Sequence, residues 1–215
     1  MTTMYQDTVK CYVCGKESKQ TVLGSTNSFG SSDLDLRPPE MMRGTMEYWA
    51  HECPYCGYIA KNIDLGTVVT EAWLARVEFI NANNIEFESE LAKRCYKEYL
   101  INLEDENKYK AFAVILNAAW ACDDAQDIGN AVLCRNLALD LIDELIEKED
   151  DPSTLILQKI DLLRRSNQFN KVLGEFSGIF MDQDLLQDIL DFQLEKAKKH
   201  DNACYTVEDV KKSIV

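Results

Sequence analysis

Four of the eight cysteines stand in two copies of one short motif. Cys11 and Cys14 occur in "KCYVCGK", and Cys53 and Cys56 occur in "ECPYCGY". One Cys-x-x-Cys turn can supply two thiolates to a metal ion, so two such turns can supply the four tetrahedral ligands of a structural zinc site. The spacing therefore predicts one structural Zn²⁺ held by these four cysteines, although four thiolates suit iron as well.

A metal with four protein ligands has no open position, so we expect it to organise the fold rather than to activate water. Gly15 and Gly57 follow the second cysteine of each motif, where the turn favours a positive φ. His51 precedes Cys53 by two residues and is expected beside the site, not in it. The alternative interpretation of the cysteine pairs is a disulfide or unrelated core thiols.

No motif for catalysis stands out elsewhere in the chain. There is no phosphate-binding loop, dinucleotide fingerprint or nucleophile elbow. The carboxylates of "CDDAQD" (Asp123, Asp124 and Asp127) are interpreted as helix-end residues, because aspartate often caps helices. Cys95, Cys122, Cys134 and Cys204 are dispersed singly and are interpreted as small hydrophobic residues. We therefore expect no enzymatic activity.

The segment between the cysteine pairs, "SSDLDLRPPE", places Asp33, Asp35 and Arg37 on one face if it is extended, since side chains alternate along a strand. Two interpretations remain open. The three side chains form a polar binding cluster or a weak site for a hard metal, or they form the solvated edge of a strand. The second is favoured, because surface ion pairs usually contribute little.

The composition changes near residue 66. Residues 1–66 are rich in Gly, Ser, Tyr and Cys and contain turn signals, which predicts a small β module resembling a zinc ribbon. Residues 67–215 contain mostly helix formers, with apolar residues at intervals of three and four. Helices are expected over about 85–103, 107–123, 127–148, 154–166, 168–181 and 183–200. The predicted fold is mainly α, with helical hairpins stacked antiparallel after the β module.

One stretch of the helical part resembles the tetratricopeptide pattern. In "IDLLRRSNQFNKVLGEF", Asn167 lies in the turn between two helices, Phe169 and Phe176 are the large residues, and Val172 occupies the small position. An offset of 41 residues places Ala131 opposite Val172 and Ala138 opposite Ile179. This offset is longer than the usual tetratricopeptide period of about 34 residues. We interpret the array as a degenerate tetratricopeptide-like repeat.

The motifs "CYVCGK", "DLDLRP" and "CPYCGYIA", followed by "AAWACDD" and "AVLCRNLA", resemble an uncharacterised bacterial family of unknown function that is common in Firmicutes. Its members carry paired Cys-x-x-Cys-Gly knuckles around an Asp-x-Asp segment, followed by tetratricopeptide-like helices. The resemblance covers residues 1–145 well and the remainder loosely. It implies zinc ligands at Cys11, Cys14, Cys53 and Cys56, and it implies no activity.

The net charge of −14 disfavours nucleic acids and anionic membranes as partners. "MTTMYQDTVK" has no apolar block typical of a secretion signal, and no apolar tract reaches the roughly 18 residues of a membrane span. We therefore expect a cytoplasmic, zinc-binding interaction or scaffold protein whose helices bind a protein or peptide.

Two other functions stay open. One is nucleic-acid binding through a local basic and aromatic face of the ribbon. That face would comprise Lys10, Lys16, Lys19, Arg37, Arg43, Lys61, Tyr12, Tyr55 and Tyr58. The other is a redox sensor, in which oxidation of the thiolates releases zinc.

Overall fold

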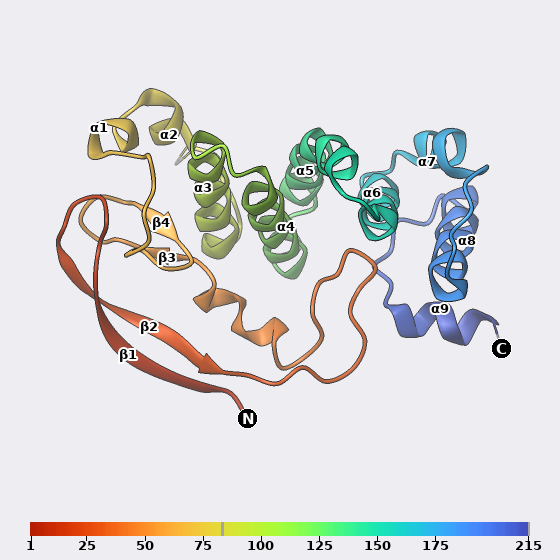
Figure 1. The fold of residues 1–215 in the computed structure, drawn as a ribbon, viewed down its shortest axis with the longest axis horizontal. Coiled ribbons are helices and arrows are strands. Elements are labelled where there is room, and N and C mark those ends of the chain that lie inside the picture. The colour runs from red at the N-terminus through yellow and green to blue at the C-terminus, as the bar shows by residue number, and fades with distance from the viewer. Residues whose placement is uncertain (83, 215) are drawn as a thin grey trace. The chain divides into compact units, whose positions relative to one another are not determined.

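A computed structural model describes residues 1–82 and 84–214 (Figure 1). The chain is mainly helical with a small antiparallel β element near the N-terminus, which confirms the predicted fold class. The chain divides into two compact units, neither of which is a continuous stretch of sequence. Unit 1 comprises Met1–Ser28 and Glu40–Cys134, and unit 2 comprises Phe29–Pro39 and Arg135–Val215.

The predicted domain boundary at residue 66 does not coincide with this division, because it lies inside unit 1. The backbone N–H of Lys61 donates to the carboxylate of Glu98, and the hydroxyl of Thr67 donates to that of Asp105. These bonds attach the β module to the helix that follows it. The segment Phe29–Pro39 was predicted as part of the N-terminal module, but it belongs to unit 2.

Unit 1 begins with two β-hairpins. β1 (Thr3–Lys10) pairs with β2 (Glu17–Ser25), and β3 (His51–Glu52) pairs with β4 (Ile59–Ala60); the 3₁₀ helix η1 (Arg43–Tyr48) precedes β3. Most of β1 is exposed, so little apolar burial supports this hairpin. Because an isolated two-stranded hairpin is only marginally stable in water, its ends need another source of stability.

The helices of unit 1 pack around small apolar side chains. They are α1 (Glu71–Leu74), α2 (Val77–Ala82), α3 (Glu90–Glu104), α4 (Lys108–Asp124) and the first part of α5 (Ile128–Lys148). Helices α3 and α4 lie side by side (Figure 1). On α3, Cys95 and Tyr99 are buried, and Leu91 packs against a cluster that contains Ala121 and Ala131. These three residues of α3 follow one another at intervals of four, so they lie on one face of the helix, and that face is a core face.

Four helices end in the same turn, although none has glycine there. Glu106, Gln126, Asn167 and His200 follow α3, α4, α6 and α8 and have φ between 53° and 61°. After each, the next N–H bonds the carbonyl five residues earlier, as in Asn107 to Asn102 and Gln168 to Leu163. This is the Schellman motif, in which glycine is the usual left-handed residue. Short identical turns thus bring consecutive helices back beside one another.

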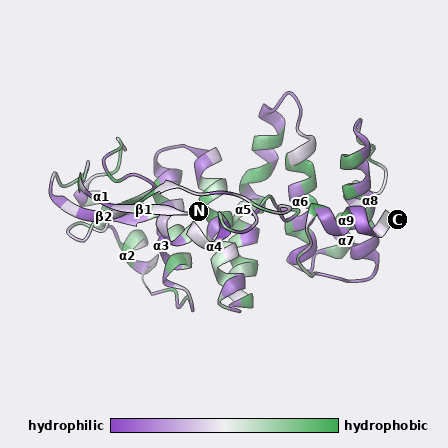
Figure 2. Cartoon of the chain, turned by 90° about the horizontal axis from the view of Figure 1, so that it is seen from below, coloured by the Kyte–Doolittle hydropathy of each residue, from purple (hydrophilic) through white to green (hydrophobic). Residues whose placement is uncertain are grey.

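Unit 2 contains the remaining helices: α6 (Ser153–Arg165), α7 (Phe169–Phe176), α8 (Asp184–Lys198) and α9 (Val207–Ile214). Their hydrophobic stripes, visible beside hydrophilic ones in Figure 2, meet in one core that includes Ile160, Val172 and Leu190. Val172 is fully buried, as the small position of the repeat pattern requires. Helix α7 is shorter than predicted and ends before Gly178, so Ile179 lies beyond it.

Helix α9 was not predicted, although its start carries a recognisable signal. Thr206 and Asp209 form a capping box, in which each side chain accepts the backbone N–H of the other. Among the described residues, no helix combines the length and apolar character needed to cross a bilayer.

Candidate metal centre and polar groove

Each cysteine motif closes one of the two β-hairpins, and the two loops have the same backbone structure. Cys11–Lys16 connects β1 to β2, and Cys53–Tyr58 connects β3 to β4. In the first loop the N–H of Gly15 bonds the carbonyl of Cys11 at 2.9 Å, and in the second the N–H of Gly57 bonds that of Cys53 at 3.0 Å. The two copies of the sequence motif therefore form the same turn.

Both glycines have the positive φ that the motif predicts, 70° at Gly15 and 74° at Gly57. A side chain at either position would strain the backbone, because L-residues rarely adopt this conformation. The turn brings the two sulfurs of each Cys-x-x-Cys onto one side of the loop.

The four sulfur atoms meet in one cluster. The Sγ atoms of Cys11 and Cys56 are 3.7 Å apart, those of Cys14 and Cys53 are also 3.7 Å apart, and all four lie within 4.8 Å of one another. Tetrahedral zinc with Zn–S bonds of about 2.3 Å requires S···S separations of about 3.8 Å. The residues present therefore fit one tetrahedral metal ion without rearrangement of the chain.

The surroundings of the sulfurs differ from one thiol to another. A hydrogen bond from the backbone N–H of Lys16 lowers the pKa of Cys14, whereas burial raises the pKa of Cys11 and of Cys56. Backbone N–H groups thus stabilise negative charge on sulfur, but burial opposes it. A divalent cation would supply the charge that lets all four thiols ionise together.

His51 lies outside the sulfur cluster, in agreement with the expectation from its sequence position. The imidazole is half-buried, and burial followed by the charge of Arg94 lowers its pKa. At neutral pH His51 is therefore an uncharged side chain at the start of β3, where it pairs with Ala60 of β4.

The proposed basic and aromatic face of the ribbon is smaller than predicted. Tyr58 is buried, and Arg37 belongs to unit 2, where it is also buried. Tyr12 and Tyr55 remain 56% exposed, and the ammonium group of Lys16 lies 5.1 Å from the ring of Tyr55. Lys10, Lys16, Lys19 and Lys61 are exposed as well, so two rings and four cations of the predicted set remain at the surface of unit 1.

The prediction of a solvated edge for Asp33, Asp35 and Arg37 is wrong. Their exposed fractions are 2%, 1% and 5%, respectively. The segment Phe29–Pro39, called the strap below, runs beside Tyr205 and Thr206, with the N–H of Leu34 donating to the carbonyl of Tyr205. The segment is also not extended at this point, since Asp33–Arg37 form a turn in which the N–H of Leu36 donates to the carbonyl of Asp33 and Leu36 has a φ of 68°.

One buried charge of the strap, Asp35, is paired with a residue of α6. Arg165 Nη1 lies 3.0 Å from Asp35 Oδ2, and the side-chain amide of Gln158 donates to the carbonyl of Asp35 at 3.0 Å. Next to them, Arg164 pairs with Asp161, and the thiol of Cys204 donates to Asp33. These contacts make the strap an integral part of the core of unit 2 and explain why buried carboxylates are tolerated there.

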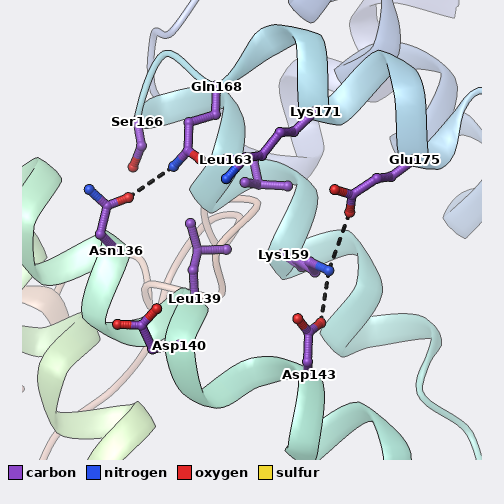
Figure 3. A pocket seen from close by; sticks show the side chains of 10 residues that line it. All are labelled: Asn136, Leu139, Asp140, Asp143, Lys159, Leu163, Ser166, Gln168, Lys171 and Glu175. Carbon is purple, nitrogen blue, oxygen red and sulfur yellow. Dashed lines mark hydrogen bonds and ion pairs between the residues drawn. The ribbon is translucent and has the colours of Figure 1, made fainter.

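A polar groove of about 530 Å³ lies between α5, α6 and α7 in unit 2 (Figure 3). Lys159 occupies its floor and pairs with Asp143 at 2.8 Å and with Glu175 at 3.4 Å. Near the turn that precedes α7, the amide of Gln168 donates to the amide oxygen of Asn136 at 2.9 Å. The groove therefore presents amide groups that can both donate and accept hydrogen bonds.

The groove is lined by further polar groups, one of which makes no hydrogen bond. Ser166 Oγ is buried and has no hydrogen-bond partner. The exposed side chains of Asp140 on α5 and Lys171 on α7 add opposite charges on the two walls (Figure 3). An unsatisfied buried hydroxyl is costly, so it marks a position where a partner group would be gained on binding. Sequence patterns did not single out these residues, because they are ordinary residues of helix surfaces and of the turn between α6 and α7.

Comparisons of the chain with protein-family models, with curated proteins and with solved structures gave no match.

Proposed function

We propose that this chain is a non-catalytic, zinc-stabilised binding protein, in which Cys11, Cys14, Cys53 and Cys56 hold one structural Zn²⁺ and the helical groove of unit 2 binds a peptide segment of a partner protein. The observation that carries the metal assignment is the cluster of four sulfurs at tetrahedral separations. Zinc supplies a rigid connection between two hairpin ends that have little apolar core.

The groove between α5, α6 and α7 supports the binding role. Its lining mixes amides, an unpartnered hydroxyl and charges of both signs, which complements the donors, acceptors and charged side chains of an extended peptide. Helical hairpins of the tetratricopeptide kind expose such concave surfaces. The resemblance to a bacterial family with knuckles followed by tetratricopeptide-like helices supports the same assignment. Four reduced thiols favour the cytoplasm as the location.

The metal assignment is tested by elemental analysis of the purified protein and of two variants. We expect one zinc per chain, its loss in Cys53→Ser, and its retention in Cys204→Ser, which changes a cysteine outside the cluster. The far-ultraviolet helical signal should largely persist in Cys53→Ser. Iron, identified by its visible absorption, would change the ion but not the site. Metal-free protein with four freely reacting thiols would instead favour the redox sensor.

The binding role is tested with a phage-displayed library of random peptides, selected on the full chain. Enriched peptides should lose binding to the variant Asn136→Ala/Lys171→Glu, which alters both walls of the groove. They should retain binding to Lys211→Glu, a matched charge reversal on the exposed side of α9. Failure to enrich any peptide, or equal binding to both variants, contradicts a peptide groove at this position.

A further inference from the structure

A second cavity, of about 470 Å³, lies inside unit 1 between β2, the η1 region and the α3–α4 pair. Val22, Trp49 and Val114 contribute apolar surface to it, and Asn62, Asn117 and Glu98 contribute polar groups. Cavities of 300–1,000 Å³ with a mostly apolar lining and a few polar groups are typical of small-molecule sites. This cavity is separate from the sulfur cluster and from the groove of unit 2.

Glu98 is the unusual residue of the cavity. Its exposed fraction is 6%, and its Oε1 accepts the backbone N–H of Lys61 at 3.1 Å. Among the described residues, no Lys, Arg or His side chain forms an ion pair with it, although the adjacent Lys97 pairs with Glu52 at 2.9 Å. The carboxylate is therefore held at a cavity wall with one backbone hydrogen bond and no ion pair, although Lys61, which also lines the cavity, and Lys110 carry positive charges that act on it.

Such a carboxylate is costly to the fold, and nothing in the packing of unit 1 requires its charge. Burial raises the pKa of Glu98 to about 7, against the opposing effects of the Lys61 hydrogen bond and of the charges of Lys110 and Lys61. A glutamine would accept the same N–H bond without the cost of a buried charge. Groups that destabilise the free protein in this way are characteristic of sites that are completed by a ligand.

We propose that this cavity binds a small organic amine, whose ammonium group pairs with Glu98 while its apolar part lies against Trp49 and Val114. A cation gains more than a neutral donor from this carboxylate, because charge-assisted hydrogen bonds are the stronger ones and the site is largely removed from water. Asn62 and Asn117 can hydrogen-bond further polar groups of the ligand. This site would make unit 1 a receptor for a metabolite, in addition to the role proposed for unit 2.

The test uses three amines and their hydroxyl counterparts as probes: phenethylamine and phenylethanol, tryptamine and tryptophol, and cyclohexylmethylamine and cyclohexylmethanol. Binding to the full, metal-loaded chain is followed by ¹H–¹⁵N NMR of the Trp49 indole and of the side-chain amides of Asn62 and Asn117. We expect at least one amine to shift these signals saturably and to bind about tenfold or more tightly than its alcohol.

Two variants locate the binding. Glu98→Gln, which keeps the acceptor for the Lys61 N–H, should weaken amine binding at least tenfold and leave alcohol binding unchanged. Ala113→Phe, which adds a side chain at the cavity wall, should weaken both classes of probe. Glu90→Gln, an exposed change at the start of α3, should weaken neither. Absence of binding by all three amines, or equal amine binding by the Glu98→Gln variant, overturns the proposal.

Discussion

At the residue scale, Glu98 makes the stability of the fold depend on pH near neutrality. Its pKa is about 7 in the folded chain, against an ordinary value of 4.5. Between these two values the folded state holds a proton that the unfolded state has released, so folding stability falls as the pH rises. Above pH 7 both states are ionised and the penalty is constant.

We therefore predict that Glu98→Gln stabilises the protein at pH 8 by about 3 kcal/mol and has little effect at pH 4.5. Urea denaturation of the wild type and the variant across this pH range measures the difference. Glu90→Gln, at an exposed position of the same helix, should show no comparable pH-dependent gain. A constant difference between wild type and the Glu98→Gln variant at all pH values would contradict the assignment.

Asp35 is also a buried carboxylate, but unlike Glu98 it has a close ion-pair partner, Arg165. We predict that Asp35→Ala destabilises unit 2 by about 3–5 kcal/mol, because it leaves the guanidinium of Arg165 buried without this acceptor. The double variant Asp35→Leu/Arg165→Met should recover much of the loss. Thermal unfolding monitored by circular dichroism compares the stability of the single and the double variant. Equal stability of the two variants would show that Asp35 and Arg165 are not coupled.

At the element scale, most of the helices could be predicted, and the turns between them could not. Apolar spacing places α3 to α6 and α8 within a few residues of their observed ends. The turns carry Glu106 and Gln126 in the left-handed conformation, where glycine is the usual signal, so composition gives no indication of them. Helix α9 was missed because its capping box starts a helix of only eight residues.

The left-handed residues in these turns allow a test of backbone strain. Glu106→Gly and Gln126→Gly should each stabilise the protein by up to about 1 kcal/mol, because glycine adopts a positive φ without steric strain. Asp124→Gly, at the end of the α-helical part of α4, should destabilise it by about the same amount. Chemical denaturation of the three variants provides the comparison, and destabilisation by all three glycines would exclude strain at the turns.

At the scale of the whole molecule, the candidate metal site was predictable and the division into units was not. The four cysteines are specified by local spacing and by two glycines, which the sequence shows directly. The strap belongs to unit 2 through contacts such as Gln158 to Asp35, which are 123 residues apart in sequence. A period of two is typical of an extended segment. It indicates neither the turn that Asp33–Arg37 form nor the contact of that turn with α6.

This arrangement predicts that residues 135–215 form an incomplete unit by themselves, because they lack Leu34 of the core and Asp35. We expect this fragment to melt well below unit 2 of the full chain. A synthetic peptide of residues 27–40 should raise its melting temperature, and the same peptide with Asp35→Ala should raise it less. A fragment as stable as the full chain would show that the strap contributes no stability.

The position of the strap between the two cysteine motifs also imposes an order on biosynthesis. All four cysteines have left the ribosome long before residues 158–207 are translated, so they could bind a metal ion before the residues that contact the strap have been made. For that interval, Asp33, Asp35 and Arg37 remain hydrated on a loop whose ends a bound metal ion would hold near each other. Their charges would keep this waiting loop soluble until the late helices arrive to enclose it.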